Sequence, residues 1–155
     1  MAWSNGKIFS AFVTDSLNRT AALDLNSDSF KVALYNNSIT PDQTVASANT
    51  AYNAGQWATA NEVSSGAQWA AGGVALSGVT SSFTGNVFTF SASNTASGAT
   101  ATLSNVHGCL IYDDTLSTPV ADQGVCYLYF GGAQSVTSGT FTIQWNASGI
   151  MQLTL

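Results

Sequence analysis

The chain ends in a pattern that alternates apolar and polar residues, and this pattern constrains the fold more than any other stretch. Two apolar sets lie on either side of a turn at residues 146–149: Phe141, Ile143 and Trp145, then Met151, Leu153 and Leu155. Side chains two positions apart on a strand share one face, so each set predicts a strand with one buried side. The C-terminus is therefore predicted to belong to a sheet core that includes Trp145, and function is expected on a surface or in a loop.

Further strands are predicted where β-branched and aromatic residues cluster between turn residues. Their expected ranges are 30–35, 74–79, 87–92, 101–103, 106–112 and 125–130. Apolar residues at helical spacing from Ile8 to Leu17 predict one short amphipathic helix, whereas residues 39–73 lack clear periodicity and predict loops with short helical turns. The expected architecture is mainly β: one β-sandwich or jelly-roll-like domain over residues 1–155, with a short N-terminal helix and a loop-rich middle segment.

Charge is scarce in this chain, because charged residues make up only 7% of it against about 25% in typical soluble domains. The net charge is -5, and Lys7, Arg19 and Lys31 are the permanent cations, so nucleic acid is not an expected partner. No apolar run of membrane-spanning length occurs and the N-terminus lacks the pattern of a secretory signal, so neither a membrane nor export is expected. Neutral surfaces keep proteins apart poorly, which favours a chain that packs against other subunits.

Few residues in this sequence could carry chemistry. His107 and Cys109 would share one face of a strand, which allows a nucleophile pair or half a metal site, but a polar strand residue beside a core cysteine is the favoured interpretation. Cys109 and Cys126 could approach each other on neighbouring strands and form a disulfide, although reduced, buried thiols are expected in the cytosol. Glu62 is the sole glutamate, so paired carboxylates for glycoside hydrolysis would need Asp partners that the sequence does not place.

The aspartates do not form a recognisable calcium loop. Asp24, Asn26 and Asp28 have the right opening spacing, but Tyr35 stands where an EF-hand requires its bidentate Glu. A looser ion site at these oxygens, or at Asp113, Asp114 and Asp122, stays open as an alternative to turn capping. The sequence therefore predicts no cofactor, no metal and no enzyme activity.

Tryptophan and tyrosine side chains in the loop-rich segment are the candidate partner-binding residues. Trp57, Trp69 and Tyr52 lie where charge is depleted, and interfaces favour such aromatic anchors. The same residues could instead anchor long loops to the core, and the sequence does not decide between these two roles.

Five stretches of the chain form a recognisable set. They are KIFSAFVTDSLN in the helix, LDLNSDSFKVALYN at the first strand, YDD after an apolar strand, YLYFGG at a strand end and FTIQWNASGIMQL at the close. Together they resemble the small virion structural proteins of tailed bacteriophages over nearly the whole chain. The resemblance implies a head decoration (cement) protein or a small tail-associated protein, and it brings no catalytic residues.

The function expected from this resemblance is that of a capsid decoration protein on the outer head surface, which stabilises the contacts between capsid subunits. Its partners would be the major capsid protein and copies of itself, in a homo-oligomer that could be a trimer. It would be located in the virion after assembly in the host cytoplasm. The alternative is a tail-tip or fibre-associated module that binds host carbohydrate through Trp57, Trp69 and Tyr52.

Overall fold

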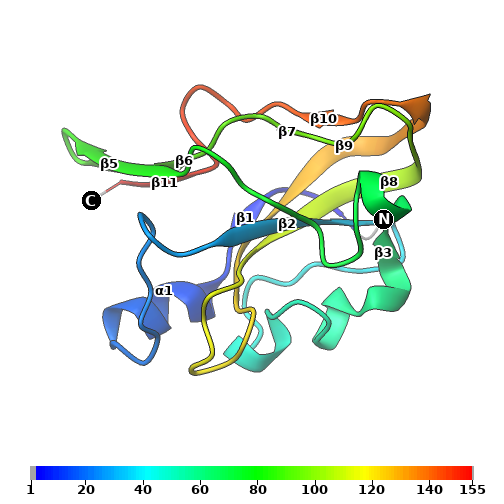
Figure 1. The fold of residues 1–155 in the computed structure, drawn as a ribbon. Coiled ribbons are helices and arrows are strands. Elements are labelled where there is room, and N and C mark those ends of the chain that lie inside the picture. Colours follow the sequence, from blue (N-terminus) through cyan, green and yellow to red (C-terminus); the bar gives the residue numbers. More distant parts are fainter. Residues whose placement is uncertain (1–2, 155) are drawn as a thin grey trace.

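The computed structural model describes residues 3–154 and shows a mainly β, β-sandwich-like fold with one helix (Figure 1). The helix α1 covers Ser10–Leu17, and four short 3-10 turns lie at Ser47–Asn49, Gly55–Trp57, Thr59–Asn61 and Gly66–Gln68. The strands are β1 Lys7–Ile8, β2 Phe30–Tyr35, β3 Glu62–Val63, β4 Val74–Ala75, β5 Thr80–Thr84, β6 Val87–Ser91, β7 Thr95–Ala96, β8 Ala101–Asp113, β9 Gly124–Gly139, β10 Thr142–Ile143 and β11 Met151–Thr154.

A six-stranded antiparallel sheet forms the centre of the molecule. Its order is β1-β9-β8-β2-β3, and β4 also pairs with β2. The long strands β8 and β9 pair along most of their length, with register shifts between Ala101 and Gly108 and again between Ile111 and Tyr112. In Figure 1, the helix and the 3-10 turns between residues 47 and 61 lie on one side of this sheet, and the two smaller sheets lie on the other. Both faces of the central sheet are thus covered, which explains why Phe30–Tyr35 is apolar almost throughout.

An aromatic layer covers the helix side of the central sheet. Trp57 lies at its middle, with ring centroids 5.1 Å from Tyr35, 5.8 Å from Trp3 and 6.0 Å from Phe9, all edge-to-face. The hydroxyl of Tyr35 donates a 2.7 Å hydrogen bond to the carbonyl oxygen of Trp57. These contacts fix the loop-rich segment on the sheet, because each ring contributes a large apolar area in a directed geometry.

Two glycines in the sheet make room for this aromatic layer. A Cβ atom at Gly108 would lie 2.6 Å from Cζ3 of Trp3, and one at Gly124 would lie 2.7 Å from Cε2 of Phe9. These distances are shorter than van der Waals contact, so only glycine allows the two rings to lie directly on the strands.

Two small sheets cover the opposite side. One has the order β11-β6-β5, and the other pairs β10 with β7. Phe90 of β6 packs edge-to-face on Phe30 of β2, with ring centroids 5.1 Å apart. The loop residue Trp69 packs against Phe141 at 6.0 Å. The core on this side is therefore built from residues that lie far apart in the sequence.

Several sequence predictions differ from the structure in detail. The predicted strand 74–79 is only the two-residue β4, and Thr80–Thr84, which was expected to be part of a connection, forms β5. The two C-terminal strands do not pair with each other: β10 pairs with β7 and β11 with β6. Leu155 lies outside the described residues. Alternation indicated the apolar face of each strand, but pairing depends on distant strands that alternation does not reveal.

We predict that Trp57→Ala lowers the free energy of unfolding by about 3–5 kcal/mol, because it removes the central ring of a packed layer. Urea denaturation followed by circular dichroism measures this change. Leu17→Ala is the control, since Leu17 is 79% exposed, and it is expected to change stability by no more than about 0.5 kcal/mol. Similar losses in the two variants would contradict the assignment of Trp57 to the core.

Candidate functional site

The structure places the predicted partner-binding tryptophans in the interior. Trp57 and Trp69 are both 0% exposed. Their ring contacts are with core residues, Tyr35 for Trp57 and Phe141 for Trp69. Neither side chain reaches the surface in this conformation. The prediction that Trp57 and Trp69 form a contact platform for a partner is therefore corrected. Their positions are those of the other interpretation, in which they anchor long loops.

Tyr52 is half-buried and belongs to a structural hydrogen-bond chain. Its ring stacks on Tyr112 at 5.1 Å, and its hydroxyl donates a 2.8 Å hydrogen bond to Oε2 of Glu62. The other oxygen of Glu62 accepts the backbone N–H of Gly72 at 2.8 Å. Burial raises the pKa of Tyr52 to about 12, and Glu62 adds to the rise. The sole glutamate is thus used to tie two parts of the middle segment together.

The two cysteines are not activated as nucleophiles, and the histidine lies beside an asparagine. Cys109 and Cys126 are buried free thiols, so no disulfide joins them. Burial raises the pKa of both thiols, to about 12 for Cys126, which is the opposite of what a nucleophile needs. Nε2 of His107 lies 3.0 Å from Oδ1 of Asn105, a residue of the same strand. The hydrogen-bond partner of this ring nitrogen is therefore Asn105 and not Cys109.

The aspartates act mainly as turn caps. The carboxylate of Asp24 accepts the backbone N–H of Asn26 at 2.9 Å and the hydroxyl of Ser27 at 2.6 Å. Asp28 accepts the backbone N–H of Asp24 at 2.6 Å. Within residues 3–154, no group of three or more His, Cys, Asp or Glu side chains is arranged to hold a metal ion. The turn-capping interpretation therefore describes Asp24 and Asp28.

Asp113 is the exception, because it is a fully buried carboxyl group. Its Oδ1 accepts the backbone N–H groups of Thr115 and Leu116 at 2.8 and 3.2 Å. Its Oδ2 is buried, and no donor among the described residues faces it. Burial raises the pKa of Asp113 to about 6, and the neighbouring carboxyl of Asp28 adds to the rise.

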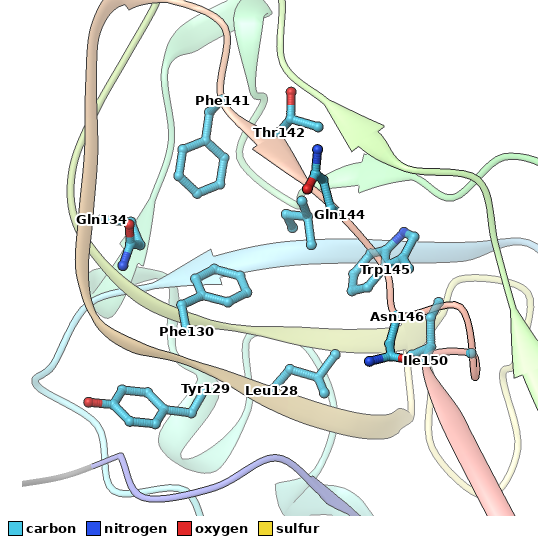
Figure 2. A pocket seen from close by; sticks show the side chains of 12 residues that line it. Leu128, Tyr129, Phe130, Gln134, Phe141, Thr142, Gln144, Trp145, Asn146 and Ile150 are labelled. Carbon is cyan, nitrogen blue, oxygen red and sulfur yellow. The ribbon is translucent and has the colours of Figure 1, made fainter.

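An open groove runs between β9 and the C-terminal segment, and we call it the β9 groove (Figure 2). It has a volume of about 450 Å³. Its lining comes from two stretches of chain: Leu128, Tyr129, Phe130 and Gln134, then Phe141, Thr142, Ile143, Gln144, Trp145, Asn146, Gly149 and Ile150. None of these twelve residues is charged. A second hollow of about 390 Å³ adjoins it, because both are lined by Leu128 and Ile150.

Half-buried aromatic rings and exposed amides meet in the β9 groove. Figure 2 shows Phe130 between Phe141 and Leu128, with the ring of Trp145 beside them. The indole ring of Trp145 is fixed by a hydrogen bond, in which its Nε1 donates to Oγ1 of Thr95 at 3.2 Å. The ring of Tyr129 points out of the groove and stacks on Trp3 at 6.3 Å.

A second groove, the helix groove, lies between α1 and the sheet β11-β6-β5. It has a volume of about 220 Å³, and all but one of its lining residues are apolar. They are Phe12, Val13, Ser16, Leu17, Leu23, Leu25, Phe88, Met151 and Leu153. Phe83 lies directly opposite Phe88 on the neighbouring strand and extends this apolar surface. Leu17 is 79% exposed and Phe83 is 58% exposed.

These surfaces were only partly predictable from the sequence. Trp145 was predicted to be in the core, yet it is half-buried and lines the β9 groove. Its neighbours Gln144 and Asn146 are exposed, and alternation alone cannot distinguish a core tryptophan from one at a groove. The groove exists because β10 and β11 join different sheets, which the local pattern does not show.

Comparison with protein families, curated proteins and solved structures found no match for this chain. No helix within residues 3–154 has the length and apolar character of a membrane span.

We predict that Asp113→Asn stabilises the protein at pH 7.5 by roughly 1–3 kcal/mol, since each unit of pKa difference corresponds to about 1.4 kcal/mol. A folded-state pKa above the unfolded value means that the folded protein holds the extra proton, so Asp113 favours folding at low pH and disfavours it as the pH rises through about 6. Asparagine can still accept both backbone hydrogen bonds and needs no proton. The gain should therefore shrink toward zero near pH 4 in urea titrations.

Asp114→Asn is the matched control for this experiment. The carboxylate of Asp114 forms a 2.9 Å ion pair with Lys31 and is partly exposed, so its neutralisation should give no stabilisation at pH 7.5. A constant effect of Asp113→Asn between pH 4 and 7.5 would contradict a raised pKa for this group.

Proposed function

We propose that this chain is a non-enzymatic virion structural protein, a capsid decoration protein that binds the outer surface of a phage head. In this role it stabilises the contacts between capsid subunits, and its partners are the major capsid protein and further copies of itself. The resemblance of the chain to small virion proteins motivates the proposal. The observation that carries it is the helix groove, an apolar surface that the chain itself leaves uncovered.

The helix groove has the character of a protein-docking surface. It combines two large exposed apolar side chains, Leu17 and Phe83, with an apolar depression beside them. Soluble proteins rarely leave such a contiguous apolar surface bare unless a partner covers it. The low charge of the whole chain agrees with this role, because the centres of interfaces are depleted of charged residues.

The chemistry of the side chains also supports a structural role. Both thiols are buried and have raised pKa values. The single glutamate accepts hydrogen bonds from Tyr52 and Gly72, and the single histidine contacts Asn105. The net charge of -5 is suited to an outer surface, away from packaged DNA.

A tail-tip or fibre-associated module that binds host carbohydrate is the alternative function. Trp57 and Trp69, the tryptophans expected to serve it, are buried, so this alternative would have to use another surface. Copy number distinguishes the two locations, because a shell component is present in hundreds of copies and a tail part in a handful.

We predict that purified virions contain hundreds of copies of this protein and that heads depleted of it lose their DNA at a lower temperature than complete heads. Quantitative gel densitometry measures the copy number, and a thermal melt of the particles with a DNA dye measures heat resistance. A handful of copies per virion, or unchanged melting of depleted heads, would contradict the decoration role.

We predict that Phe83→Asp weakens binding to depleted heads by about tenfold or more, because a charge replaces an aromatic anchor of the docking surface. Ser82→Asp is the matched control: it adds the same charge on the same strand, and its side chain points to the opposite face. Co-sedimentation with heads measures both affinities. Equal binding by the two variants would exclude the helix groove as the head-binding surface.

A further inference from the structure

We infer that the β9 groove is a binding site for a neutral carbohydrate chain, whose sugar rings stack on Trp145 and Phe130 and whose hydroxyls bond to the side-chain amides of the groove. This site is separate from the helix groove and does not depend on the position of the protein in a virion. No residue of the two grooves is shared.

The lining of the β9 groove has the two chemistries that a sugar ring presents. A pyranose has an apolar C–H face, which packs against an aromatic ring, and a rim of hydroxyl groups that both donate and accept hydrogen bonds. Trp145, Phe130 and Phe141 supply half-buried rings, and Gln134 and Gln144 supply exposed amides. An amide side chain carries both a donor and an acceptor, so it matches a hydroxyl without any net charge.

The amides of the groove are free to bind. Within the described part of the chain, the side chains of Gln134 and Gln144 form no hydrogen bond with the protein. The Oδ1 atom of Asn146 accepts the backbone N–H of Ser148 at 2.8 Å, which orients this side chain and leaves its amino group available. Figure 2 shows these amides at the edge of the groove, around the rings.

The aromatic part of the groove is already in place. Trp145 is fixed by the hydrogen bond of its Nε1 to Thr95 and by the bond from its backbone N–H to Oδ1 of Asn94, which is 3.1 Å long. Phe130 and Phe141 pack on each other with ring centroids 6.3 Å apart. A preorganised surface loses little conformational entropy when a ligand binds, which matters most for weakly binding ligands such as sugars.

Charge and size favour a neutral oligosaccharide over other ligands. No charged residue lines the groove, and the net charge of -5 repels acidic polysaccharides and nucleic acids. A volume of about 450 Å³ falls within the range of about 300–1,000 Å³ that is usual for ligand sites. A protein-docking surface is expected to be apolar at its centre, as the helix groove is, whereas the β9 groove mixes rings with amides.

The test begins with the full chain on an array of neutral glycans built from glucose, galactose, mannose and N-acetylated hexosamines, with sulfated and sialylated glycans as the acidic arm. The best neutral oligosaccharide is then titrated while tryptophan fluorescence and its quenching by acrylamide are recorded. Trp3, Trp57 and Trp69 are fully buried, so Trp145 is the tryptophan whose quenching a groove ligand should suppress.

Three variants give the decisive comparison by isothermal titration. Trp145→Ala should weaken the binding of the chosen oligosaccharide by about tenfold or more, as expected for the loss of a stacking ring. Gln144→Ala should weaken it by about threefold to tenfold, the effect of one hydrogen bond. Asn86→Ala is the control, because this exposed amide lies at the β5–β6 turn, outside the groove lining, and binding should not change.

Gln144→Ala keeps the test valid if Trp145→Ala fails to fold, because Gln144 is exposed and its amide forms no hydrogen bond with residues 3–154. The absence of binding to every neutral glycan on the array would overturn the inference, as would unchanged affinity in Gln144→Ala and Trp145→Ala. Preferential binding of the acidic arm, or loss of head binding in Gln144→Ala without any glycan binding, would also overturn it and would identify a different occupant.

Discussion

Trp57 ties the loop-rich middle of the chain to the central sheet, and much of the molecule depends on this packing. Its indole contacts the rings of Trp3, Phe9 and Tyr35, which come from the N-terminus and from β2. Edge-to-face contacts among buried rings are directional, so they fix the orientation of the segments that carry them. A segment with little regular secondary structure is thereby held in one conformation, and the two-residue β3 is the strand that it adds to the central sheet.

The opposite side of the sheet is covered in a different way, and this difference creates the two grooves. There the small sheets meet the central sheet through Phe90, Met151 and Ile143, which are buried. Toward their outer ends the same sheets extend past the core, so Phe83 on one of them is left exposed. The sheet β11-β6-β5 borders the apolar helix groove beside α1, and the segment that contains β10 borders the neutral β9 groove with its exposed amides. Two surfaces of distinct chemistry allow two kinds of partner.

The fold class and the buried positions of the periodic strands could be read from the sequence, because burial leaves a periodic pattern in a short stretch of chain. The apolar run of β2 and the alternation of β11 lie where they were predicted, and the helix ends at Leu17 as predicted but begins at Ser10, because Lys7–Ile8 forms β1. The role of the tryptophans could not be read in this way. Trp57 and Trp69 lie in aperiodic loops, where the same composition fits an exposed anchor and a buried one equally well.

The sequence by itself determined that this protein is mainly β, poor in charge and without a recognisable set of reactive groups. These properties follow from local alternation and from composition, which need no knowledge of distant contacts. The tertiary structure alone decided that β10 and β11 join different sheets, that Trp145 borders a groove and that Asp113 is buried beside Asp28. Each of these outcomes depends on which distant segments pack together, and that choice is made by the free energy of the whole core.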